Sequence, residues 1–430
     1  MKLAVAVQRY GADINGGAEQ HARYIAERLA RHVDVEVVTT CARDYITWRN
    51  ERAPGAETVN GIAVRRFPVD HERDPQVFGR HSRRVFEQTH SIADELSWLQ
   101  SEGPASRKMI DYLARKDAFD YVILFSYRYF HAYHAARRLA SKAILVPTAE
   151  RDSAIGLSIF GPIFRGVRGI MYNSHEERAM VHAAAHNETV PGVVVGVGSD
   201  VPDRADGDRF RRTFKLDRPF ALYIGRIDEN KGCKELFEHY QRYATTFPLG
   251  LDLVLIGSAV MAVPNHSRVH HLGFLDDRDK FDALAASDVL IMPSYFESLS
   301  MVALEAWAMG TPVLANGRCD VLKGQCIRSG AGLYYETYEE FAETLYALES
   351  RGPLHARLGR NGREYFRTNY AWPVIEKKYL DMLERLRGGT PSANAMEPLP
   401  GWLSRRTRGL PASNDVLVSL PSGAVVPQHA

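Results

Sequence analysis

Short hydrophobic runs rich in β-branched residues alternate with segments of helical period along the first half of the chain. Residues 17–31 place Ala22, Ile25 and Leu29 on one face of a predicted helix. The predicted strands of this half are residues 2–7, 33–40, 121–126, 143–148 and 169–174. Strands that alternate with helices in this way are typical of a parallel sheet covered by helices on both faces.

The same alternation returns in the second half, after a segment rich in Gly, Pro and Val at 189–203 that is suited to a hinge. The strands predicted there are residues 220–225, 251–257, 269–275, 288–294 and 312–317. We therefore predict an α/β protein of two doubly wound halves. Open sheets of this kind bind ligands beyond the carboxyl ends of their strands, so two facing halves predict a cleft between domains.

The segment ESLSMVALEAWAMGTP, residues 297–312, places a carboxylate inside an otherwise apolar helix. A helix that is apolar all round is packed on every side, and a buried carboxylate needs a hydrogen-bonding or charged partner. Glu305 should therefore have such a partner. Ser298 and Ser300 are natural N-cap residues, and Gly310 followed by Thr-Pro ends the helix.

Glu297 precedes Glu305 by about two helical turns, so the two side chains should point in broadly similar directions. Glu297 lies near the backbone N–H groups of the first turn, which have no partner within the helix. Free donors beside two acids suggest a polyhydroxylated, anionic ligand. The plainer alternative is a capping acid at Glu297 and, at Glu305, a buried acid satisfied by protein donors.

A second candidate site lies in GRIDENKG, residues 225–232. Arg226 and Lys231 share this strand-to-helix connection. The helix that begins near Lys231 would point its N-terminal dipole at whatever the two cations bind. A phosphate or diphosphate fits this charge, whereas the alternative is a solvated loop with surface Arg and Lys.

A glycine-bearing turn, GADINGGAEQ at residues 11–20, leads into the first predicted helix. Gly16 and Gly17 would let the backbone approach a ligand closely. The turn lacks the G-x-G-x-x-G pattern, which counts against NAD or FAD and leaves an ordinary turn as the alternative.

Composition and charge narrow the function further. A chain of 430 residues exceeds what a single core supports, so two domains are expected. The formal net charge of +2 gives no reason to predict a nucleic-acid partner. The four cysteines contain no C-x-x-C pair and the N-terminus does not resemble a signal peptide, so we expect reduced thiols in the cytoplasm.

We predict neither a membrane span nor a metal site. The uncharged run at residues 153–164 is shorter than the roughly 20 residues that a span requires, although peripheral contact with a membrane stays open. His131 and His134 lie on one helix face without clustered acids. Neither the H-E-x-x-H motif of zinc proteases nor the G-x-S-x-G motif of serine hydrolases is present.

With these motifs in hand, residues 1–386 resemble the retaining glycosyltransferases of family 4, which have the GT-B fold of two Rossmann-like domains. The resemblance rests first on the E-x7-E motif and its context at residues 293–315. Residues 223–232 and the GGAE turn at residues 16–19 support it.

The resemblance implies a role for each candidate residue. Glu297 would contact hydroxyls of the donor sugar near the anomeric centre and is the predicted catalytic residue. Glu305 would bind the ribose hydroxyls of the nucleotide, so that the ligand is its partner. The remaining donor-binding residues would hold the diphosphate or complete the pocket: Gly16, Gly17, Arg226, Lys231, Ser298, Leu299 and Ser300.

The resemblance also implies a domain division. An acceptor-side domain would span residues 1–195 and a donor domain residues 196–365, while residues 366–387 would form a helix that crosses back. We expect a mostly disordered tail at residues 388–430, which are rich in Pro, Gly and Ser. Many relatives carry a histidine in the first domain that touches the donor sugar. Here the candidates for its place are Tyr127, Glu150 and Asp152, and the alternative is that the contact is absent.

The implied reaction moves a sugar, with retention of configuration and without a metal or other cofactor, from a nucleotide-diphosphate sugar to a saccharide, lipid-linked or small-molecule acceptor. Bacterial surface polysaccharide synthesis at the inner face of the membrane is the commonest setting. The alternatives are a nucleotide-sugar epimerase, a sugar phosphorylase, or a noncatalytic scaffold that binds a sugar nucleotide. The sequence identifies neither the nucleotide, the sugar, the acceptor nor the oligomeric state.

Overall fold

The computed structural model describes residues 1–14, 16–115, 118–349, 352–389, 396 and 413–419 of the 430. Its first sheet has eight strands in the order β3-β4-β2-β1-β5-β6-β7-β8, parallel except for the β3–β4 pair. The strands are β1 (Lys2–Ala6), β2 (Asp34–Thr40), β3 (Gly55–Val59), β4 (Ile62–Phe67), β5 (Tyr121–Phe125), β6 (Ala143–Val146), β7 (Gly169–Tyr172) and β8 (Gly192–Val194).

The second sheet has six strands in the order β11-β10-β9-β12-β13-β14, and all its pairs are parallel. The strands are β9 (Phe220–Ile224), β10 (Asp252–Ile256), β11 (Val269–His271), β12 (Val289–Met292), β13 (Val313–Asn316) and β14 (Gly332–Tyr335). Strand order reverses between β1 and β5 in the first sheet and between β9 and β12 in the second. Such switch points are where open α/β sheets bind ligands.

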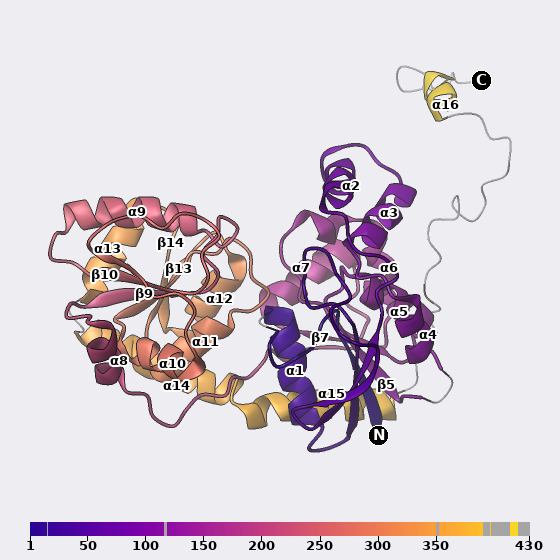
Figure 1. Ribbon diagram of the computed structural model, residues 1–430, viewed down its shortest axis with the longest axis horizontal. Helices are drawn as coiled ribbons and strands as arrows, with labels where there is room; N and C mark the ends of the chain where they lie inside the picture. Colours follow the sequence, from indigo (N-terminus) through magenta and orange to yellow (C-terminus); the bar gives the residue numbers. More distant parts are fainter. Residues whose placement is uncertain (15, 116–117, 350–351, 390–395, 397–412, 420–430) are drawn as a thin grey trace, which may run out of the picture.

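Helices cover both sheets and form two lobes that face each other (Figure 1). The helices of the first lobe are α1 (Gly17–Leu29), α2 (Pro75–Glu87), α3 (Ile92–Glu102), α4 (Arg107–Leu113), α5 (Phe130–Arg138), η1 (Ser153–Gly156), α6 (Phe160–Gly166) and α7 (His175–Ala185). Those of the second are α8 (Gly207–Phe214), α9 (Cys233–Thr246), α10 (Asp277–Ala286), α11 (Met301–Met309), α12 (Asp320–Ser329), α13 (Tyr338–Glu349) and α14 (Pro353–Asn369). The predicted α/β class with two doubly wound halves is confirmed.

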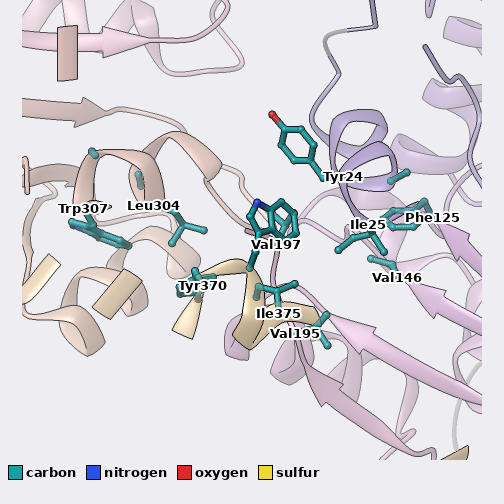
Figure 2. Close-up of a cluster of buried hydrophobic side chains, with 14 of the residues drawn as sticks. Tyr24, Ile25, Phe125, Val146, Val195, Val197, Leu304, Trp307, Tyr370 and Ile375 are labelled. Atoms are coloured by element: carbon teal, nitrogen blue, oxygen red, sulfur yellow. The ribbon is translucent and has the colours of Figure 1, made fainter. Parts of the chain in front are cut away.

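Helix α15 (Trp372–Gly388) connects the lobes (Figure 1). It packs against α1, and the Tyr379 hydroxyl lies 3.3 Å from Nε2 of His21. Figure 2 shows Ile375 of α15 beside Val195 and Val197, in a buried cluster that extends from α1 to α11. This continuous apolar packing fixes how the two lobes face each other.

The structure adds strands that the periodicity did not predict. β3 and β4 form a hairpin through Asn60 and Gly61, both with positive φ, which is the geometry of the Asn-Gly hairpin turn. Part of the segment predicted as a hinge is the edge strand β8, because its β-branched residues pair with β7. The hinge prediction was therefore too long.

The predicted disordered tail, residues 388–430, lies mostly outside the described residues. Within it the structure describes a short helix, α16 (Ser413–Ser419), whose Leu417 and Val418 are exposed. Among the helices that the structure describes, none combines the length and the apolar character that crossing a bilayer demands.

Candidate active site

Two adjoining cavities lie between the lobes. The central cavity, about 490 Å³, is lined by residues such as Gln8, Glu150 and Asn173 of the first lobe and Lys231 and Glu297 of the second. The side cavity, about 690 Å³, is lined by Arg226, Gly257, Ser258, Lys280 and Glu305, among others. Glu19, Gln20, Tyr129, Ile224, Gly225, Met301 and Val302 line both cavities.

An ion pair at the central cavity joins the loop of residues 225–232 to the segment of residues 297–312. Lys231 Nζ lies 2.8 Å from Glu297 Oε1. The pair forms because Gly232, with a φ of 74°, lets the β9–α9 loop touch the end of β12, where a Cβ would lie 2.1 Å from the Pro293 carbonyl oxygen. Burial by itself would lower the pKa of Lys231, but the charge of Glu297 outweighs it and raises that pKa, so the ammonium is charged.

Glu305, 3% exposed, lines the side cavity rather than the central one. Its Oε1 accepts hydrogen bonds from Ser199 Oγ at 2.7 Å and Lys280 Nζ at 3.0 Å. The buried carboxylate therefore has protein partners before any ligand binds. Oε2 has no hydrogen-bond partner within the described part of the chain, so one oxygen is left for a ligand. The sequence did not identify Ser199 or Lys280 because both come from distant segments.

The remaining residues of the β9–α9 loop and of the glycine turn divide between the two cavities. Arg226 reaches the side cavity, where its Nε donates to Asp228 and its Nη1 donates to the Tyr45 hydroxyl at 3.0 Å. Gly17 lines the central cavity and Gly16 the side cavity. A Cβ at Gly16 would lie 2.0 Å from Oε2 of Glu19, so a larger residue there would displace that carboxylate.

The turn that precedes α11 forms one side of the central cavity through Ser298, Leu299 and Ser300. Ser300 is the N-cap, because its Oγ accepts from the N–H of Ala303 at 3.2 Å. Ser298 Oγ instead accepts from Nδ2 of Asn173 at 3.4 Å, which is a hydrogen bond between the lobes. Only one of the two predicted cap residues is thus the cap.

The three first-lobe candidates have different environments. Tyr127 is buried, and its hydroxyl donates to Asp152 Oδ1 at 3.4 Å. Asp152 pairs with Arg128 at 2.6 Å and caps η1. The carboxylate of Glu150 makes no hydrogen bond or ion pair with any residue that the structure describes, and it lines the central cavity. Burial, and then the charge of Glu297, raises its pKa to about 7.

Three further residues of the central cavity were missed by the sequence. Gln8, Asn173 and Ser294 follow β1, β7 and β12, and each is 1% exposed. Gln8 Oε1, Asn173 Oδ1 and Ser294 Oγ have no hydrogen-bond partner in the structure. Their position within two residues of a strand end was the available signal, but single polar residues in that position are common.

Neither histidine of residues 130–138 lies at the cavities. His131 is fully buried, with Nε2 3.1 Å from the Phe125 carbonyl oxygen, and burial lowers its pKa to about 4. The His134 ring lies tilted against Phe130, with centroids 4.2 Å apart, and burial also lowers the pKa of His134 to about 4. Among the described residues, no group of three or more His, Cys, Asp or Glu side chains is arranged to hold a metal ion.

The family match to known proteins lies in the second lobe. Residues 205–365 match the family model described as Glycosyl transferases group 1. The lipopolysaccharide core biosynthesis glycosyltransferase LpsE of Rhizobium meliloti (strain 1021) is 30% identical over 187 residues, which are 41% of this chain and 53% of that protein. The chain spans about half the length of the curated relatives it matches first.

Solved structures match both lobes together. Sucrose-phosphate synthase from Thermosynechococcus elongatus superposes with a TM-score of 0.66 at 17% identity, over 90% of this chain and 100% of that one. Anabaena Alr3699/HepE in complex with UDP gives a TM-score of 0.63 at 14% identity, over 90% and 100% of the two chains. These likenesses show that the fold is GT-B, as the resemblance of the sequence implied.

Proposed function

We propose that this protein is a retaining glycosyltransferase of the family-4 type, which transfers a sugar from a nucleotide-diphosphate sugar to a hydroxyl group. The observation that carries the proposal is the Lys231–Glu297 pair at the switch point of the second sheet, beside a second cavity that contains Glu305. The group 1 family match over residues 205–365 supports the same reaction class.

The two cavities suggest how the donor lies. The nucleoside occupies the side cavity, where the free oxygen of Glu305 accepts hydrogen bonds from ribose hydroxyls. The diphosphate lies where the cavities meet at Gly225, between Arg226 and Lys231. The N-terminal end of α9 adds partial positive charge there. The sugar then enters the central cavity beside Glu297. The UDP complex of the structural neighbour supports a nucleotide ligand.

Transfer then needs one bond to break and one to form on the same face of the sugar. The bond between the anomeric carbon and the phosphate oxygen breaks, and the acceptor oxygen bonds to that carbon. The leaving phosphate oxygen takes the acceptor proton. Lys231 and the α9 end stabilise the negative charge that develops on the diphosphate, which is the role a metal serves in other transferases, so we expect none to be required.

Glu297 serves two purposes in this proposal. One oxygen holds Lys231 in position, and the carboxylate accepts hydrogen bonds from donor-sugar hydroxyls as positive charge develops at the anomeric carbon. We assign residues 1–195 to the acceptor-side domain, residues 196–365 to the donor domain and residues 366–387 to the returning helix. The name of LpsE supports surface polysaccharide synthesis as the setting.

The proposal is tested by incubating the protein with UDP-, GDP- and ADP-sugars, with and without sugar acceptors, and following donor and products by NMR. We expect one donor to be consumed, with an α-linked product from an α-linked donor and no effect of EDTA. Nucleotide release together with an epimerised sugar would indicate the epimerase, and dependence on inorganic phosphate the phosphorylase. A donor that binds but stays unchanged with every acceptor would indicate a scaffold.

A further inference from the structure

The first-lobe side of the central cavity presents hydrogen-bond acceptors that have no donor. Neither Gln8 Oε1 nor Asn173 Oδ1 has a hydrogen-bond partner among the residues that the structure describes, and both residues are 1% exposed. Nδ2 of Asn173 already donates to Ser298, so the oxygen is the free end of that amide. A buried acceptor without a donor is costly, which indicates that a ligand supplies the missing hydrogen.

Glu150 adds a third acceptor to this wall. The carboxylate of Glu177 bridges two backbone segments, since it accepts from the N–H of Ala149, next to Glu150, at 2.6 Å and from the N–H of Asn173. The loop that carries Glu150 and the strand end that carries Asn173 are therefore fixed relative to each other. Neither protonation state of the Glu150 carboxyl gives the wall a positive charge.

The cationic side chains that line the central cavity are already paired. Arg128 lies 2.9 Å from Glu102 and 2.6 Å from Asp152, and Lys231 pairs with Glu297. The imidazole of His21 is neutral, because burial lowers its pKa to about 3. A bound donor diphosphate would further occupy Lys231, so among the described residues that line this cavity a second anion would meet only cations that are already paired.

We propose that the acceptor substrate is an uncharged polyhydroxylated compound, a sugar or polyol whose hydroxyls donate hydrogen bonds to Gln8, Asn173 and Glu150, and that phosphorylated acceptors are excluded. The proposal rests on the proposed glycosyltransferase function. A phosphate dianion only accepts hydrogen bonds, so it would face unpartnered oxygens, whereas hydroxyl groups donate to them. Specificity of this kind comes from penalising the wrong ligand.

The test compares matched acceptor pairs with the donor that the protein consumes: glucose, mannose, fructose and myo-inositol against their monophosphates. Transfer of radiolabelled sugar gives kcat/KM for each compound. We expect kcat/KM for the neutral member of each pair to exceed kcat/KM for its monophosphate by about tenfold or more. Glu150→Gln should narrow this ratio several-fold by removing the negative charge, while Glu188→Gln, at an exposed position of the same lobe, should leave it unchanged.

Three results would overturn the proposal. One is preference for a phosphorylated member, and another is failure of every neutral compound while nucleotide binding and donor consumption persist. The third is an unaltered ratio in a folded Glu150→Gln protein. The wild-type ratio decides the matter if that variant does not fold. Loss of nucleotide binding and donor consumption in the wild-type protein would instead defeat the proposed function itself.

Discussion

The two walls of the cleft differ in how their polar groups are satisfied. On the second-lobe wall, Lys231 pairs with Glu297 and Lys280 with Glu305, so charge meets charge at 2.8 and 3.0 Å. On the first-lobe wall, the buried amide oxygens of Gln8 and Asn173 have no donor in the described part of the chain, whereas the second-lobe wall leaves one hydroxyl, that of Ser294, in that state. A wall of paired charges suits a ligand with fixed diphosphate and ribose groups, whereas unpartnered acceptors suit a ligand recognised by its hydroxyls.

The largest effect is expected at Glu297. Replacing it with Gln removes the charge nearest the reacting sugar, so kcat should fall about 100-fold or more while the Kd of the nucleotide diphosphate changes little. Single-turnover kinetics separate the two quantities. Glu343→Gln, at an exposed position of α13, is the control. Unchanged turnover in the Glu297→Gln protein would show that Glu297 has no role in catalysis.

Lys231→Ala should mainly weaken binding. The diphosphate loses its most buried cation, so its Kd should rise on the order of 30- to 100-fold, while the unphosphorylated nucleoside binds as before. Calorimetry with both ligands measures this difference. Lys234→Ala, at an exposed position of α9, should leave both affinities unchanged. An equal loss of affinity for the nucleoside and for the nucleotide diphosphate would show that the phosphates do not bind at Lys231.

Glu150 of the first-lobe wall should make the free energy of unfolding depend on pH. The pKa of Glu150 is raised to about 7 in the folded protein from its usual 4.5, so the folded state binds the proton more tightly than the unfolded state. Stability from this group is present below pH 4.5 and is lost as pH rises to about 7. Relative to wild type, Glu150→Gln should therefore gain roughly 3 kcal/mol in unfolding free energy across this window.

Denaturant unfolding of both proteins at several pH values measures this gain. Subtracting the two curves removes most of the contribution of Glu177, whose pKa burial, and to a smaller extent the charge of Glu150, raises to about 8. A difference between the two proteins that stays flat with pH would show that Glu150 is solvated and is not part of a desolvated wall.

Glu305→Gln should give the smallest change. Loss of the carboxylate weakens hydrogen bonds to the ribose, so the Kd of the nucleotide diphosphate should rise about tenfold. Removing both ribose hydroxyls from the ligand should then matter for the wild-type protein but not for the variant. Titrations with the 2′,3′-dideoxy analogue measure this, and a variant that still discriminates would contradict the ribose assignment.

Much of the second lobe could be predicted because its candidate residues lie in continuous segments. Arg226 and Lys231 share one loop, while Glu297 precedes α11 and Glu305 lies within it, so strand and helix periods place them. What could not be predicted is their division between two cavities. That depends on the contact of Gly232 with Pro293 and on Ser199 and Lys280, which come from distant segments.

The first lobe was predicted less completely for a physical reason. Its core strands have clear hydrophobic runs, but residues 55–67 and 75–113 add a hairpin and three helices that stand outside the strand–helix alternation of the core. Its cavity residues are single side chains at the ends of β1, β6 and β7. Only the folded sheet brings Gln8, Glu150 and Asn173 to one wall.

The most direct test of the whole account is a crystal structure of the protein with the nucleotide diphosphate that binds it, chosen among UDP, GDP and ADP. We predict phosphate oxygens within hydrogen-bond distance of Lys231 Nζ, ribose hydroxyls on Glu305, and an open central cavity beside Glu297 for the sugar. A nucleotide bound in the opposite sense, with its ribose at Glu297, or bound outside both cavities, would contradict the account.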